Sequence, residues 1–63
     1  MTNFVTLVCV DRFTAMEANS ILSAAAELRV EAASLVPFAR AALRDGRRVH
    51  YHGLVAAYRA ACA

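Results

Sequence analysis

The residues best able to do chemistry are concentrated between Leu43 and Gly53, in the segment LRDGRRVHYHG. This basic segment contains three arginines, both histidines of the chain and a tyrosine. Guanidinium groups bind carboxylates and phosphates, whereas imidazoles bind metal ions or move protons. Three interpretations follow: a phosphate grip, a metal-binding loop, or a helix end and connector whose charges face water.

A metal site would have to combine the two histidines with the two cysteines. Structural zinc motifs place paired cysteines about two to four residues apart and paired histidines about three to five apart. Here Cys9 and Cys62 stand alone near opposite ends of the chain, and His50 and His52 are separated by a single residue. We therefore predict no metal site. The cysteines are expected to be free and buried as small apolar side chains, with a disulfide between the two ends as the alternative.

Catalysis by an activated cysteine or serine would need a base, an orienting group and a substrate cleft. The chain has only 63 residues, and its alanine-rich segments leave little room for such a cleft. Its two glycines match neither a phosphate-binding loop nor a dinucleotide-binding fingerprint. The sequence therefore predicts a protein that is not an enzyme and that uses no cofactor.

Charge is distributed unevenly along the chain. Up to residue 39 there are four acidic residues and two arginines, whereas residues 40–63 carry five arginines and one acidic residue. Such asymmetry indicates an anionic partner, either an acidic protein surface or a nucleic acid, or a dipolar molecule that pairs with itself. The residues predicted to contact that partner are Arg40, Arg44, Arg47, Arg48, His50 and Tyr51.

Length and composition indicate one small folded domain, residues 1–63. The chain is 60% hydrophobic but only 8% aromatic, so its core is apolar and thin. A domain of this size buries only about 60% of its unfolded surface, and a partner surface would add stability. Charged residues interrupt every window long enough to span a bilayer, and the apolar start lacks the basic region of a secretion signal. A cytoplasmic location is expected.

The predicted fold class is α-dominant, α+β at most, with an N-terminal short strand followed by two or three helices. The strand is predicted over Asn3–Val10, because this segment is rich in β-branched residues and has no helical periodicity. Both of its faces are apolar, so it would have to be covered on both sides or paired across a subunit interface.

The first helix has a clear start in the sequence. Thr14 and Glu17 have the spacing of a capping box, which predicts a helix over residues 14–34. Pro37 then either kinks this helix or begins a second one over residues 35–44.

The remainder of the chain is predicted from its two glycines. Gly46 ends the second helix as a C-cap residue. Residues 47–51 alternate in polarity and form either a short strand or a connector, which Gly53 breaks. A last helix is predicted over residues 54–62, where apolar residues recur at helical spacing.

An alanine-rich seam follows the predicted helices. Its positions are spaced alternately three and four residues apart, and alanine alternates with isoleucine or leucine. Small alanine side chains let a facing helix approach closely, so we predict self-association as a homodimer through this seam. Packing of the seam against the last helix of the same chain is the alternative. The seam residues are Ala18, Ile21, Ala25, Leu28, Ala32 and Leu35.

The order of elements over residues 3–46 resembles the ribbon-helix-helix repressors, in which a short strand precedes two helices. This resemblance implies a dimer that inserts its paired strands into the major groove of DNA. The basic edge from Arg40 to Arg48 would then contact phosphates. One strand face should read the bases, but it offers few groups that hydrogen-bond to them. It consists of Thr2, Phe4, Thr6 and Val8.

The leading prediction is a small non-enzymatic protein-interaction module, inhibitor-like or adaptor-like, that self-associates and docks on an acidic protein surface. The alternative is a small DNA-binding regulator of ribbon-helix-helix topology. No membrane association is predicted. The basic segment itself is interpreted as a helix end and connector whose charges face water and a partner.

Overall fold

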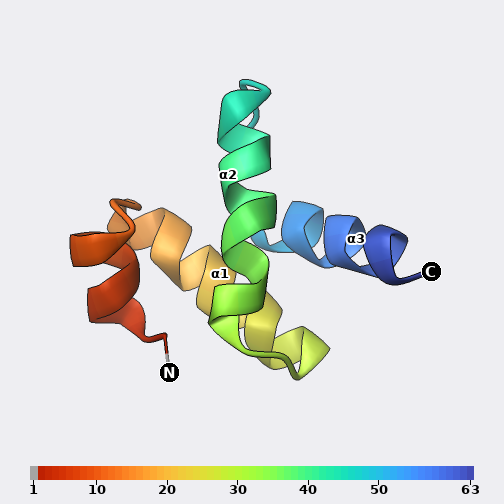
Figure 1. Cartoon of the computed structure of the whole chain (residues 1–63), viewed down its shortest axis with the longest axis horizontal. Coiled ribbons are helices and arrows are strands. Elements are labelled where there is room, and N and C mark those ends of the chain that lie inside the picture. The colour runs from red at the N-terminus through yellow and green to blue at the C-terminus, as the bar shows by residue number, and fades with distance from the viewer. Residues whose placement is uncertain (1) are drawn as a thin grey trace.

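The described part of the protein, residues 2–63 of a computed structural model, is built from helices (Figure 1). A short π-helix, η1, spans Thr6–Val10, and the first long helix, α1, spans Ala15–Leu28. A 3-10 turn, η2, covers Ala32–Leu35 and leads into α2, Val36–Arg44. The last helix, α3, spans Tyr51–Cys62.

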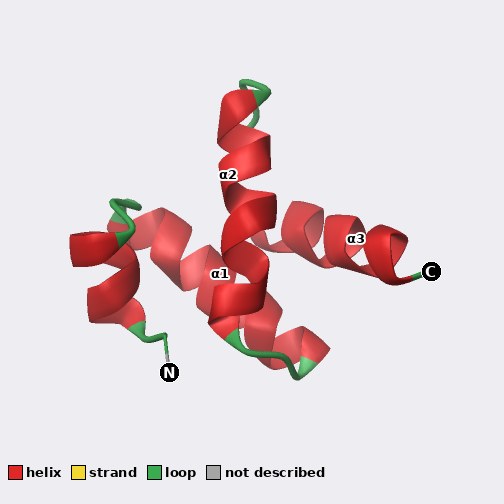
Figure 2. Cartoon of the chain, viewed as in Figure 1, coloured by secondary structure: helices red, strands yellow, loops and turns green. Residues whose placement is uncertain are grey.

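The strand predicted over Asn3–Val10 is wrong, because this segment is helical and residues 2–63 contain no strand (Figure 2). The Asn3 side chain accepts a hydrogen bond from the Thr6 amide at 2.9 Å, and the Leu7 amide donates to the Asn3 carbonyl at 3.0 Å. The second predicted strand, over residues 47–51, is also absent. A strand with no neighbouring strand would leave its backbone N–H and C=O groups without hydrogen-bond partners, whereas a helix pairs these groups internally. The absence of a neighbouring strand therefore outweighs the preference of β-branched residues for strands.

The predicted capping box at the start of α1 is confirmed. The Thr14 hydroxyl accepts a hydrogen bond from the Glu17 amide at 3.1 Å, and the Glu17 carboxylate accepts one from the Thr14 amide at 2.8 Å. The predicted end at residue 34 is wrong, because α1 stops at Leu28. Arg29 follows in the left-handed conformation with φ 56°, and the Val30 amide donates to the Ala25 carbonyl at 3.0 Å. This is a Schellman ending that lacks its usual glycine.

The second helix follows the sequence prediction closely. Pro37 lies in the first turn of α2 and separates two helices instead of kinking one. At the other end Gly46 has φ 74°, as expected of a C-cap glycine. Its amide donates to Leu43 at 3.0 Å, and the Arg47 amide donates to Ala42 at 2.8 Å, which completes a second Schellman motif.

The third helix begins earlier than predicted. It starts at Tyr51, and Gly53 lies in its first turn instead of breaking the chain. His50 caps the helix, because its Nδ1 atom accepts a hydrogen bond from the Gly53 amide at 3.3 Å. A Cβ atom at position 53 would lie 2.8 Å from His50 Nε2, so the glycine leaves space for the capping ring.

One apolar core holds these helices together. Leu7, Ile21 and Leu35 are fully buried, and several alanines fill the space between them. The helix α1 packs chiefly against α3 and η2. The radius of gyration, 10.4 Å, matches the value of about 10.6 Å expected of a folded domain of this length.

The predicted self-association seam lies inside this core. Five of its six residues are buried within the single chain and Leu28 is partly buried. The seam is also interrupted, since α1 ends before Ala32. These side chains therefore pack within one molecule. Self-association of two copies through the seam stays a prediction, and it would require the core to open. The buried five are Ala18, Ile21, Ala25, Ala32 and Leu35.

Candidate partner-binding groove

A hollow of about 490 Å³ lies between α2 and α3. Its lining combines apolar residues of the two helices with residues of the basic segment. The floor is formed by Phe38, Ala42, Leu54 and Ala57, and the rim by Arg47, Arg48 and His50. We call this hollow, with its rim, the α2–α3 groove.

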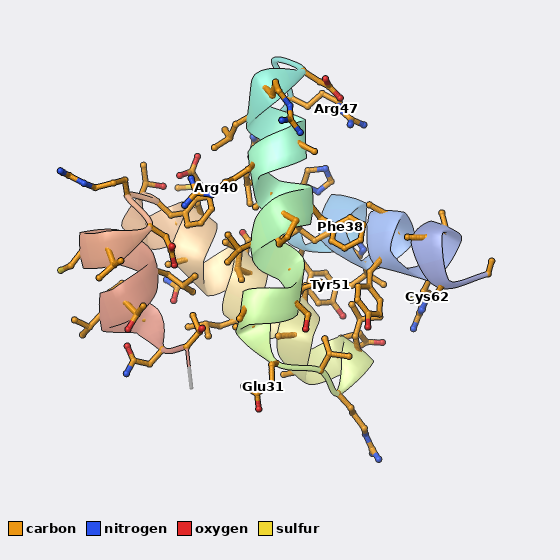
Figure 3. All side chains as sticks on the ribbon, in the orientation of Figure 1. Glu31, Phe38, Arg40, Arg47, Tyr51 and Cys62 are labelled. Carbon is orange, nitrogen blue, oxygen red and sulfur yellow. The ribbon has the colours of Figure 1, made fainter. Side chains whose placement is uncertain are left out.

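Small residues keep the α2–α3 groove open. Ala42 of α2 and Ala57 of α3 are too short to fill the space between the helices, and Gly53 adds no side chain. Phe38 bounds the groove and is fixed by an edge-on contact with Tyr58, with ring centroids 5.7 Å apart. Figure 3 shows Phe38 on the side of α2 that faces α3. The result is an apolar depression whose walls are held by helix packing.

The rim of the groove is positively charged. Arg47 contacts Asp45 at 3.2 Å, but both side chains are largely exposed, so this pair is weak. Arg48 is exposed and has no ion pair within residues 2–63. His50 stands beside them at the N-terminus of α3, where the helix dipole adds partial positive charge. An anionic group at the rim would therefore be attracted by several positive charges.

Arg40, predicted to share this edge, lies elsewhere. Its Nη2 atom is 3.4 Å from Asp11 Oδ1 and donates to the Asp11 carbonyl at 3.3 Å. The guanidinium also lies over the Phe13 ring, 5.2 Å from the centroid. In Figure 3 Arg40 is on the side of α2 that faces the N-terminal helix, away from Phe38. The predicted basic edge is thus divided between two sides of α2.

Two further predicted partner residues also lie outside the groove lining. Arg44 is exposed in the last turn of α2. The Tyr51 hydroxyl donates a hydrogen bond to Glu27 Oε1 at 2.8 Å, and Glu27 Oε2 lies 3.7 Å from Arg59 Nη2. The hydrogen bond to Glu27, then desolvation, and then the negative charge of that carboxylate raise the pKa of Tyr51 above its ordinary value. Tyr51 therefore joins α3 to α1 and belongs to the scaffold.

The sequence did not reveal the floor of the groove. Phe38 and Ala42 are four residues apart, and Leu54 and Ala57 are three apart, so each pair lies on one helix face. This spacing is the signal that was available. Which two faces meet depends on how α2 and α3 cross, and that is not readable from spacing alone.

The cysteines do not contribute a site. Both are free and exposed, so their predicted burial is wrong. Within the described residues, no three histidine, cysteine or acidic side chains gather closely enough to hold a metal ion. His50 and His52 therefore do not form a ligand set with Cys9 and Cys62.

Comparison with known proteins gives no further guide. No protein-family model, no curated protein and no solved structure matches this chain. In the described part of the chain, no helix combines the length and the apolar character needed to cross a bilayer. The geometry and charge of the α2–α3 groove are what remains to indicate function.

Proposed function

We propose that the chain is a small non-enzymatic protein-interaction module that binds an acidic segment of a partner protein in the α2–α3 groove. One observation carries this proposal: an apolar hollow lies directly beside Arg48, which makes no ion pair within residues 2–63, and Arg47, whose exposed pair with Asp45 is weak. The hollow accepts an apolar side chain of the partner, and the rim attracts carboxylates next to it. Charge complementarity of this kind raises the association rate and selects the partner.

The acidic residues of the chain are mostly engaged. Four of the five have contacts within the molecule: Asp11, Glu17, Glu27 and Asp45. The side chain of the fifth, Glu31, makes no hydrogen bond or ion pair within residues 2–63, and it lies at the opposite end of the molecule from Arg47 (Figure 3). Among the described residues, no acidic residue lines the α2–α3 groove, and the one carboxylate beside it, that of Asp45, pairs weakly with Arg47; an anionic group bound in the groove would therefore come from another molecule.

Several arginines, by contrast, have no carboxylate partner. Four of the seven make no ion pair within the described residues: Arg12, Arg29, Arg44 and Arg48. Arg48 lines the groove, and Arg44 is in the last turn of α2 close to it in sequence. Excess positive charge is therefore present where the apolar hollow opens.

The groove suits binding better than catalysis. Its volume is within the range of about 300–1,000 Å³ typical of ligand clefts. The exposed cysteines are outside its lining, and His50 Nδ1 is already used by the Gly53 amide. A nucleophile paired with a free base is thus absent from the residues that line it.

Selection of peptides from a random displayed library tests the proposal. We expect the chain to select peptides that are net acidic and contain a large apolar residue. Arg48→Gln should weaken the best peptide about three- to tenfold at low salt, because it removes a rim charge. Arg29→Gln is the matched control, since it removes the same charge from a distant exposed position. Equal loss from both variants, or selected peptides without acidic residues, would contradict the proposal.

DNA binding remains the alternative, favoured by the arginines without ion pairs. The ribbon-helix-helix topology does not apply, because Asn3–Val10 does not form the strand that this topology requires. Binding would then have to use phosphates alone, since the exposed face of α3 consists mostly of alanine. Titration of a labelled duplex at two salt concentrations distinguishes the two. A steep salt dependence that requires Arg44 and Arg48 would favour DNA over an acidic peptide.

A further inference from the structure

A second, smaller hollow shares two residues with the α2–α3 groove. It has a volume of about 200 Å³ and lies where the start of α1 meets the end of α2. Arg47 and Arg48 line both hollows. Its other lining residues are the apolar Met16, Leu43 and Val49 and the polar Thr14 and Glu17; the Glu17 carboxylate accepts a hydrogen bond from the Thr14 amide. The two arginines therefore stand at the boundary between two apolar depressions.

The second hollow keeps large apolar side chains in contact with water. Met16 is 73% exposed and Leu43 is 45% exposed, while Val49 is buried. The unbranched thioether of methionine adapts its shape to different surfaces, a property common at binding sites. Two exposed apolar side chains around a depression fit a second apolar anchor better than they fit a solvated surface.

We propose that the partner's acidic segment carries two apolar anchors, one for each hollow, with its carboxylates between them facing Arg47 and Arg48. This inference rests on the proposed function and specifies its ligand. The arginines shared by the two hollows require negative charge between the anchors, and not only at one flank. A second copy of this chain is a poor occupant, because it carries the same net charge of +2 and its acidic residues are mostly engaged.

The test uses the tightest peptide from the displayed library as the probe, with four variants of the full chain. Leu43→Ser and Met16→Ser alter the second hollow, and Ala57→Gln partly fills the first. Val5→Ser is the matched control, because Val5 is a 64% exposed apolar residue that lines neither hollow. All four positions are exposed, so the variants should fold, and circular dichroism melting checks this.

We expect Leu43→Ser and Ala57→Gln each to weaken the peptide about five- to tenfold, with no change for Val5→Ser. In a second peptide, alanine replaces the apolar residue that occupies the second hollow. Leu43→Ser should not change the affinity for this peptide, whereas Ala57→Gln should still weaken it. If Ala57→Gln weakens binding but Leu43→Ser and Met16→Ser do not, the second anchor is refuted and the proposed function survives. If no acidic peptide is selected, the proposed function itself fails.

Discussion

The alanine-rich seam and the basic segment differ in how far the structure follows their sequences. The seam has the spacing and small residues of a helix interface between chains, yet it is closed within one chain. The basic segment reads as a helix end and connector, yet Arg47, Arg48 and His50 border an apolar hollow. The difference teaches that apolar periodicity identifies which residues are buried. It does not tell whether the same chain or a second chain covers them. Unpaired charge beside a hollow is the better indicator of an open surface.

The largest expected effect is on the seam. Ile21 is fully buried, so Ile21→Ala should remove packing and lower the free energy of unfolding by about 2–5 kcal/mol. Urea denaturation followed by circular dichroism measures this loss. The matching change in the basic segment, Leu43→Ala, should cost far less because Leu43 is 45% exposed. Equal losses in the free energy of unfolding at Ile21 and Leu43 would contradict the distinction between a buried seam and an exposed basic segment.

A smaller loss of stability, caused by Ala25→Leu, tests whether the seam packs within one chain or between two chains. Ala25 is 6% exposed, and Ala25→Leu should destabilise the fold by about 1–3 kcal/mol through overpacking. For an intramolecular seam the melting temperature should not depend on protein concentration in either form. A melting temperature that rises with concentration, and whose rise Ala25→Leu abolishes, would return the seam to a role in self-association.

The next effect is stabilising. Arg29 is exposed and holds the left-handed conformation at the end of α1, which costs a residue with a side chain about 1 kcal/mol relative to glycine. Arg29→Gly should therefore raise the free energy of unfolding by about that amount, measured by urea denaturation. Peptide binding should be unchanged, since Arg29 lines neither hollow. Destabilisation would mean that α1 does not end in this conformation.

The smallest effects compare two arginines that share the predicted basic edge. Arg40 makes an exposed pair with Asp11, so Arg40→Gln should cost at most about 1 kcal/mol in stability and leave peptide binding unaltered. Arg48→Gln should leave stability nearly unchanged and weaken the peptide. Calorimetric titration and urea denaturation of both variants supply the comparison. If Arg40→Gln weakened peptide binding and Arg48→Gln did not, the binding site would lie on the side of α2 that carries Arg40.

Local signals in the sequence were sufficient for some helix ends. The capping box at Thr14 and the C-cap at Gly46 were predicted because one or two residue types determine each. The end of α1 was not predicted, because Arg29 takes a conformation that usually belongs to glycine. Asn3–Val10 was misread because its composition favours a strand, whereas the absence of a pairing strand is a property of the whole fold.

The candidate site was predictable in its charged half only. Arg47, Arg48 and His50 were selected by their charge and their position in sequence, and the structure brings them together. Arg40 was selected for the same reasons and Tyr51 for its position, but Arg40 contacts Asp11 and Tyr51 contacts Glu27. The apolar floor was missed because it arises where two helices cross, and spacing within each helix does not determine that crossing.

The central claim is that the α2–α3 groove binds an acidic segment, and mapping amide chemical shifts of the isotope-labelled chain with the selected peptide tests it most directly. The largest changes should occur at Phe38, Leu54 and Ala57 in the floor and at Arg48 on the rim. Changes confined to Phe4, Val5 and Val10, which are exposed large apolar residues in and just before η1, would contradict the account.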